Sequence, residues 1–251
     1  MTNLNTKNPV TWCPGCPNFM ILASVKKVIE KLIKEGFAKQ EEFAMATGIG
    51  CHAKIFDYLN ISGIYGLHGR VLPTALGIKL GNPGLTVLGF GGDGDTYAEG
   101  IAHFVHNCRY NADMTMIVHD NRAFSLTTGQ ATPTSEQGYK TKTEPQGAVN
   151  MPLNPVKLAL AAGCGFIARV NGKDIAHMSE IFEKAIKHKG FSFVEVLQDC
   201  LIFNKEVNNY DEFMYKVKDN KDSKVAEKLV GEWDYNSRGR IPVGVLFERL
   251  K

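Results

Sequence analysis

The sequence lacks the features that mark membrane and secreted proteins. It contains no run of about 18 consecutive apolar residues, which a membrane-spanning helix would need. Its first ten residues, MTNLNTKNPV, have no apolar core of the kind found in signal peptides. Internal repeats and low-complexity segments are also absent, so neither a solenoid nor a disordered linker is indicated. We therefore expect a cytoplasmic protein that does not bind a membrane.

An excess of charge of one sign is also missing. The 251 residues carry 29 Lys and Arg against 26 Asp and Glu, a net charge of +3 that is spread along the chain. Without a basic stripe the composition gives no support for nucleic-acid binding. A hydrophobic content of 44% in a chain of this length is enough for one large core. Six cysteines in a reducing compartment indicate thiols or metal ligands rather than disulfides.

Short apolar runs alternate with segments of helical spacing. Strands are predicted at residues 43–47, 85–90, 114–118, 166–170 and 192–197, and helices at residues 17–36, 96–108, 155–163 and 174–187. This alternation requires right-handed crossovers between parallel strands. The predicted fold class is therefore α/β, with a mostly parallel sheet covered by helices on both faces.

Two segments depart from this alternation. Residues 125–154 contain three prolines and few apolar residues, which predicts a long surface loop. From residue 205 to residue 240 the charge density rises and the strand pattern is lost, before a closing apolar run at residues 241–247. We interpret residues 1–204 as the functional domain and residues 205–251 as a charged C-terminal tail that packs on this domain or on a partner.

A glycine-rich turn with acidic residues follows the predicted strand 85–90. GFGGDG at residues 89–94 fits the G-x-G-x-x-G pattern of dinucleotide sites, but Asp93 would repel a pyrophosphate held directly by the turn. Mg²⁺ reverses that repulsion, because it prefers oxygen ligands and shares them with phosphates. Asn121 follows the next predicted strand and reaches the same sheet edge, so the pattern predicts a site for Mg²⁺ and a diphosphate. Thr96 and Glu99 form a potential capping box that would start the next helix.

Four of the six cysteines are placed to reach the same edge. A C-x-x-C motif precedes the helix at residues 17–36, and two further cysteines follow predicted strands; the set comprises Cys13, Cys16, Cys51 and Cys200. Four thiolates suit either zinc or an iron–sulfur cluster, and the spacing does not separate the two. Cys108 and Cys164 lie within or just after predicted helices and are expected to be core thiols.

Taken together, these motifs resemble the β subunit of 2-oxoacid:ferredoxin oxidoreductases, a family of thiamine diphosphate enzymes, from about residue 11 to residue 204. The matching motifs are WCPGC, GIGC, GLHGR, PTALGIKL, GGDGD, DN followed by LTTGQATPT, YKTKT and NPVKLALAAG. The resemblance implies a thiamine diphosphate-binding fold and the oxidative decarboxylation of a 2-oxoacid, of the pyruvate or 2-oxoglutarate class, to acyl-CoA and CO₂. It also implies coenzyme A as co-substrate, ferredoxin as electron acceptor and an α subunit as partner, and leaves room for γ and δ subunits.

The resemblance assigns roles to particular residues. Mg²⁺ would be held by Asp93, Asn121 and the carbonyl of Ala123, and a [4Fe–4S] cluster by Cys13, Cys16, Cys51 and Cys200. The cofactor-binding residues would be Ile49, Gly50, Cys51, His52, His68, Gly94, Asp95, Ser125 and Leu126. Two residues receive catalytic roles, Lys54 near the substrate carboxylate and His68 beside the thiamine. Departures from the family pattern occur at Pro17, His52 and Phe124-Ser125, which affects the substrate assignment most.

Three alternatives remain at this point. A non-oxidative thiamine diphosphate decarboxylase or synthase would explain GGDGD and Asn121 but would leave the four cysteines without a role. A dinucleotide-binding oxidoreductase would use G-x-G-x-x-G and Asp120, but would leave Asp93 unexplained. A cluster- or zinc-binding non-catalytic subunit would use the cysteines alone.

Overall fold

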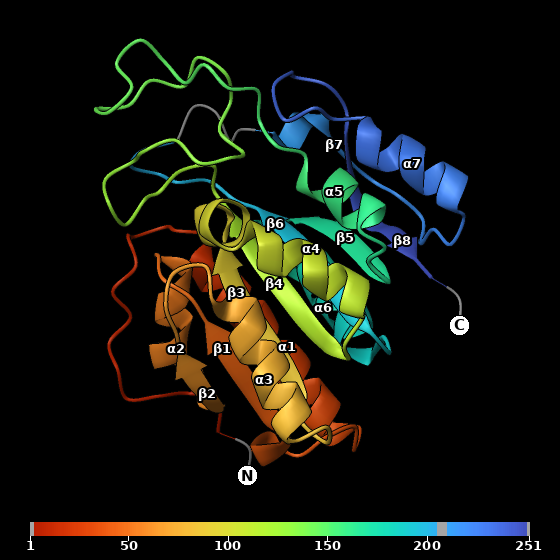
Figure 1. The fold of residues 1–251 in the computed structure, drawn as a ribbon. Coiled ribbons are helices and arrows are strands. Elements are labelled where there is room, and N and C mark those ends of the chain that lie inside the picture. Colours follow the sequence, from red (N-terminus) through yellow and green to blue (C-terminus); the bar gives the residue numbers. More distant parts are fainter. Residues whose placement is uncertain (1–2, 205–209, 250–251) are drawn as a thin grey trace.

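The computed structural model describes residues 3–204 and 210–249 of the chain. Within these ranges eight strands form one sheet in the order β2-β1-β3-β4-β6-β5-β8-β7 (Figure 1). Neighbouring strands are parallel except β5 and β8, which are antiparallel. The strands are β1 Phe43–Thr47, β2 Ser62–Tyr65, β3 Thr86–Gly92, β4 Met114–Asp120, β5 Phe166–Asn171, β6 Phe191–Leu197, β7 Met214–Lys216 and β8 Ile241–Glu248. The predicted mostly parallel sheet is confirmed.

Helices cover both faces of this sheet, as predicted. The helices α1 and α6 pack against each other on one face, whereas α3, α4, α5 and α7 cover the other, where α3 and α4 lie in front of the sheet in Figure 1. Their bounds are α1 Asn18–Lys34, α2 Ile55–Tyr58, α3 Val71–Gly81, α4 Ile101–Tyr110, α5 Pro155–Ala161, α6 Ile175–Lys187 and α7 Ser223–Gly231. None of the helices in the described ranges is long and apolar enough to cross a membrane.

All five strands predicted from apolar runs are present, because each is a buried strand whose two faces are both covered. Three other strands were not predicted. Every residue of β2 is exposed, so it has no apolar run, and β7 is only three residues long. The strand β8 follows the charged segment and contains Pro242 and Gly244, yet it pairs with β5 inside the sheet.

The segment that we interpreted as a tail therefore contributes β7, α7 and β8 to the same sheet and its helical layer. Residues 205–209, where the predicted tail begins, lie outside the described residues. The division of the chain at residue 204 stays a prediction.

The start of the helix after GGDGD differs from the prediction. Residues Gly94–Glu99 form a π-helical turn, η3, and α4 begins only at Ile101. Thr96 is buried inside this turn and its Oγ1 forms no hydrogen bond within the described residues. The predicted capping box of Thr96 and Glu99 is therefore wrong. Wide turns of this kind are frequent at functional sites, because they redirect side chains within a helix.

A buried ion pair joins the C-terminal elements to the centre of the sheet. Arg169 Nε donates to Glu195 Oε2 at 2.7 Å, and neither side chain is accessible to solvent. The Tyr235 hydroxyl contacts both partners, lying 2.6 Å from Arg169 Nη2 and 2.7 Å from Glu195 Oε2. Trp233 stacks on Tyr235 with ring centroids 4.1 Å apart. The segment that carries the two aromatic rings is thus anchored to β5 and β6.

We expect the variant Glu195→Ala to lose about 3–5 kcal/mol of unfolding free energy, because it leaves Arg169 charged and unpaired in the core. The matched control is Glu180→Ala, which breaks the exposed pair between Glu180 and Lys184 on α6. That variant should lose no more than about 0.5 kcal/mol. Chemical denaturation followed by circular dichroism measures both values. Equal losses in the two variants would contradict the expected role of the buried pair.

Candidate functional site

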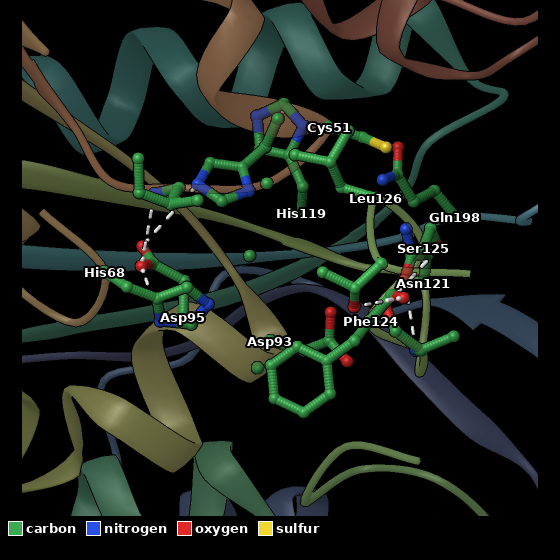
Figure 2. Close-up of a pocket in the computed structure, with 17 residues that line it drawn as sticks. Cys51, His68, Asp93, Asp95, His119, Asn121, Phe124, Ser125, Leu126 and Gln198 are labelled. Atoms are coloured by element: carbon green, nitrogen blue, oxygen red, sulfur yellow. Dashed lines mark hydrogen bonds and ion pairs between the residues drawn. The ribbon is translucent and has the colours of Figure 1, made fainter. Parts of the chain in front are cut away.

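A pocket lies at the carboxyl ends of β1, β3, β4 and β6 (Figure 2). Parallel strands end at a common edge, which is where open α/β sheets bind ligands. The pocket brings together these residues that were predicted from the sequence: Ile49, Gly50, Cys51, His52, His68, Asp93, Gly94, Asp95, Asn121, Ala123, Ser125 and Leu126. Its other lining residues are Gly92, His119, Phe124, Thr127 and Gln198.

Asp95 connects the walls of the pocket. Its carboxylate accepts hydrogen bonds from the backbone N–H of Gly69 at 2.7 Å and of Ile49 at 3.4 Å. His52 Nε2 lies 3.5 Å from Asp95 Oδ2, and His68 Nδ1 lies 3.4 Å from Asp95 Oδ1. Burial raises the pKa of Asp95, but the imidazole of His52 and the N–H of Gly69 outweigh burial and bring this pKa below its usual value. Asp95 is therefore held as a carboxylate.

The loop after β1 fits closely against this carboxylate. A Cβ atom on Gly48 would lie 2.1 Å from Asp95 Oδ2, so a larger residue would displace the carboxylate from the N–H groups that hold it. Glycine at this position lets the loop at residues 48–52 and the GGDGD turn approach each other.

Asp93 and Asp120 form a buried pair of carboxyl groups beside the pocket. Thr134 Oγ1 lies 3.2 Å from Asp93 Oδ2 and 2.9 Å from Asp120 Oδ1, so one hydroxyl donor serves both groups. Burial raises the pKa of Asp93 to about 6. Burial, followed by the charge of Asp93, raises the pKa of Asp120 well above its usual value. Because two carboxylates in a dry site repel each other, their arrangement favours a bound cation.

The other two predicted Mg²⁺ ligands lie in the same pocket. Asn121 Oδ1 accepts a hydrogen bond from the backbone N–H of Ala123 at 3.1 Å, and the carbonyl of Ala123 accepts one from the N–H of Ser125 at 2.9 Å. In Figure 2 Asp93 lies in the middle of the view, with Asp95 on one side and Asn121 on the other. The assignment of Asp93, Asn121 and Ala123 as ligands stays a prediction.

Several buried polar atoms around the pocket form no hydrogen bond within the described residues. They are His52 Nε2, His68 Nδ1, Asp95 Oδ2, His119 Nε2 and Asp120 Oδ2. Buried polar groups in folded proteins are nearly always paired. Three of these atoms, His52 Nε2, His68 Nδ1 and Asp95 Oδ2, take part only in the ion-pair contacts of 3.4–3.5 Å described above. So few hydrogen bonds at one place fit a site that is completed by a polar ligand.

The C-x-x-C motif forms a tight turn next to the pocket. The N–H of Cys16 donates to the carbonyl of Cys13 at 3.0 Å, and Gly15 between them has a φ of +80°. A proline followed by a residue of positive φ is typical of a type II turn, and the Cys13 thiol lies near enough to affect the pKa of Cys16.

All four predicted cluster ligands are electrostatic neighbours. Burial, together with the nearby thiols of Cys51, Cys13 and Cys200, raises the pKa of the Cys16 thiol to about 11. Across residues 3–204 and 210–249, however, no three or more His, Cys, Asp or Glu side chains are gathered closely enough to hold a metal ion. The four cysteines thus converge, but their role as ligands stays a prediction. Cys108 and Cys164 are fully buried, which confirms them as core thiols.

Lys54 does not line the pocket. Its ammonium lies 3.2 Å from Thr11 Oγ1. Burial raises the pKa of the Cys51 thiol, and the charge of Lys54 offsets part of this increase. The predicted contact of Lys54 with a substrate carboxylate stays a prediction.

His119 and Gln198 were not assigned to the site from the sequence. His119 Nδ1 lies 2.9 Å from Asn18 Oδ1, and burial lowers the pKa of His119 well below its usual value. Both residues stand at or just after the ends of predicted strands, in positions equivalent to those of Asp93 and Asn121. The rule that located those two residues could therefore have located His119 and Gln198 as well.

A comparison with known protein families identifies the general class to which this chain belongs. Residues 48–196 match the family described as "Thiamine pyrophosphate enzyme, C-terminal TPP binding domain". The fold and the acidic glycine turn therefore define a thiamine diphosphate-binding protein, and the dinucleotide-binding alternative is set aside.

Comparison with individual relatives identifies the family within this class. The chain is 38% identical to 2-oxoacid:ferredoxin oxidoreductase subunit beta of Saccharolobus solfataricus, over 94% of this chain and 81% of the relative. It is 42% identical to 2-oxoglutarate synthase subunit KorB of Archaeoglobus fulgidus, over 76% of this chain and 70% of the relative. The solved structure of 2-oxoglutarate:ferredoxin oxidoreductase from Magnetococcus marinus, with 2-oxoglutarate, coenzyme A and succinyl-CoA bound, matches with a TM-score of 0.91 and 30% identity, covering 99% of this chain and 84% of that one. The chain belongs to the β-subunit family of 2-oxoacid:ferredoxin oxidoreductases, which confirms the family predicted from its motifs.

Proposed function

We propose that this chain holds thiamine diphosphate, Mg²⁺ and a [4Fe–4S] cluster in an enzyme that oxidatively decarboxylates a 2-oxoacid. In the overall reaction a 2-oxoacid and coenzyme A give acyl-CoA, CO₂ and a proton, while two electrons pass to ferredoxin one at a time. The observation that carries the proposal is the buried pair Asp93 and Asp120 at the edge of a pocket in which several buried polar atoms form no hydrogen bond within the described residues. A cation and a polar ligand would neutralise and complete this arrangement.

The diphosphate half of the site follows from the acidic turn. Asp93, the Asn121 side chain and the Ala123 carbonyl would hold Mg²⁺, with Gly94 and Asp95 beside the diphosphate. A Cβ atom on Gly94 would lie 2.2 Å from the Phe124 ring, so glycine is needed where the turn meets the opposite wall. Thr134 supports the site by donating its hydroxyl to Asp93. When bound, thiamine diphosphate supplies the nucleophilic carbon and the electron sink of the decarboxylation.

The residues around Asp95 would orient the ligand. Because Asp95 stays ionised, it keeps the imidazoles of His52 and His68 turned toward the pocket. Ile49, Gly50, Ser125 and Leu126 also line the pocket and would contact the bound cofactor. His68 is the more exposed of the two histidines, which supports its proposed role beside the thiamine.

The cysteine side of the site would hold the electron acceptor. Cys51 lines the pocket and belongs to the group of four neighbouring thiols, so a cluster held there would lie beside the thiamine site. Trp12 Nε1 donates to the Cys51 carbonyl at 2.6 Å and fixes the loop that carries this thiol.

Asp93→Asn is the direct test of the metal site. We expect the variant to bind thiamine diphosphate with Mg²⁺ roughly 100-fold more weakly, since replacing even a residue that only supports a metal ligand costs 10–100-fold in affinity. Calorimetric titration of the full chain, purified with its partner subunit, measures this affinity with and without Mg²⁺.

The matched control is Asp113→Asn, at the opposite end of the sheet, where Asp113 forms ion pairs with Lys79 and Lys189. The Asp113→Asn variant should bind thiamine diphosphate with Mg²⁺ as tightly as the unchanged protein does. Equal Mg²⁺-dependent binding by Asp93→Asn would refute the proposed metal site.

A further inference from the structure

Arg122 is a fully buried arginine between the pocket and the C-terminal elements. It follows directly after Asn121 in a left-handed backbone conformation, with a φ of +59°. Burial lowers the pKa of its guanidinium. Since burying an arginine is costly, its retention in the core calls for a role that an apolar residue of similar volume would not fill.

On the pocket side Arg122 fixes the carboxyl pair. Its backbone N–H donates to Asp120 Oδ1 at 3.1 Å, and its Nε donates to the carbonyl of Thr134 at 2.6 Å. The hydroxyl of the same Thr134 contacts both Asp93 and Asp120. Arg122 therefore helps to set the position of a hydroxyl that donates to Asp93.

On the other side the guanidinium reaches three aromatic residues, Tyr210, Trp233 and Tyr235, which we name the aromatic clamp. It donates to the Tyr210 hydroxyl and to the Tyr235 carbonyl. Its Cζ also lies 5.5 Å from the ring centroid of Tyr210 and 5.6 Å from that of Trp233. The guanidinium of Arg122 thus contacts both the aromatic clamp and Thr134, whose hydroxyl donates to Asp93.

We propose that Arg122 is a positioning residue that couples the order of the aromatic clamp to the binding of Mg²⁺ and a diphosphate at Asp93. The inference rests on the proposed function, because it concerns the same site. Coupling between two sites is reciprocal, so a ligand at Asp93 stabilises the clamp by the same factor by which an ordered clamp strengthens binding. A lysine cannot replace Arg122, because its single ammonium cannot donate to Thr134 and to the clamp in the same geometry.

The test uses the full chain purified with its partner subunit and two variants of different severity. Tyr210→Phe removes only the hydroxyl that contacts Arg122 and Glu136, and should raise the Kd for thiamine diphosphate with Mg²⁺ about threefold to tenfold. Arg122→Lys should raise it roughly tenfold to 100-fold. The matched control is Tyr215→Phe, which removes a tyrosine hydroxyl bonded to Glu232 in the same part of the chain but not connected to Arg122. Its Kd should not change.

Hydrogen–deuterium exchange gives a readout that does not depend on activity. Adding thiamine diphosphate and Mg²⁺ should slow exchange in peptides from residues 210–235 of the unchanged protein and of Tyr215→Phe, but not of Arg122→Lys. If the unchanged protein binds the ligand while Tyr210→Phe keeps the same Kd, or while exchange in these peptides does not slow, the coupling is refuted and the proposed function stands. Equal weakening by Tyr210→Phe and Tyr215→Phe also refutes it. If the unchanged protein shows no Mg²⁺-dependent binding, both proposals fail.

Discussion

Purified without a partner, the chain is expected to decarboxylate no 2-oxoacid at a detectable rate. The family resemblance implies that a carboxylate, usually Glu, from a separate pyrimidine-binding domain must help to form the reactive carbon of the thiamine. Within the described residues no Glu lines the pocket. The two acidic residues that do line it are already engaged, Asp95 by backbone N–H groups and Asp93 by Thr134. We therefore expect the required general acid to come from another chain.

Co-expression with the α subunit should restore turnover, measured as CO₂ release together with reduction of ferredoxin or a dye. The isolated chain should still bind its cluster, so a visible absorption spectrum serves as the control for its integrity. Robust decarboxylation by the verified single chain would overturn this expectation and would require a general acid among these 251 residues.

Replacing Cys51 or Cys200 with Ser should abolish both the broad visible absorption and the reduction of ferredoxin. A [4Fe–4S] cluster depends on all its thiolate ligands, and serine is a poor substitute for one of them. Cys164→Ser is the matched control, because Cys164 Sγ already lies 3.2 Å from the carbonyl of Phe166 and a hydroxyl can use the same acceptor. This variant should retain the spectrum and the activity.

Metal analysis of anaerobically purified protein completes the experiment. Iron with inorganic sulfide in the unchanged protein, lost in Cys51→Ser and Cys200→Ser, supports the cluster. Zinc in place of iron would contradict it and would favour the non-catalytic alternative. Identical behaviour of the Cys51, Cys200 and Cys164 variants would show that the ligand set is wrong.

The central part of the fold could be predicted because buried parallel strands need continuous apolar runs. Prediction failed where burial comes from tertiary neighbours rather than from local pattern. The strand β8 carries Pro242 and Gly244, which are unfavourable in strands. Its position depends on pairing with β5, where Arg169 lies opposite Gly244, more than 70 residues away in the sequence. The capping-box pattern at Thr96 was misleading because the chain continues from Asp93 into a π-helical turn, which has no signature of its own.

The residues of the site also divide into those that could be predicted from the sequence and those that could not. Residues at strand ends, such as Asp93 and Asn121, could be placed because the geometry of a parallel sheet fixes that edge. Thr134 and Arg122 could not, because their contacts depend on how the loop at residues 125–154 folds back. No helix or strand forms in that loop, yet it buries Thr134 completely beside Asp93. A chemically important residue in a long loop has no periodic pattern by which it can be found.

The pocket is assembled from strand ends that are far apart in the chain, from Ile49 after β1 to Gln198 after β6. Ribosomes add about 5–20 residues per second. The part of the pocket wall at Ile49 is therefore synthesised on the order of ten seconds before the part at Gln198. Until β6 pairs with β4, the pocket beside Asp93 lacks the wall that Gln198 contributes. The first three cysteines of the thiol group likewise precede Cys200, so they remain open to oxygen while translation continues. We therefore expect the proposed ligands to bind only after β6 has joined the sheet.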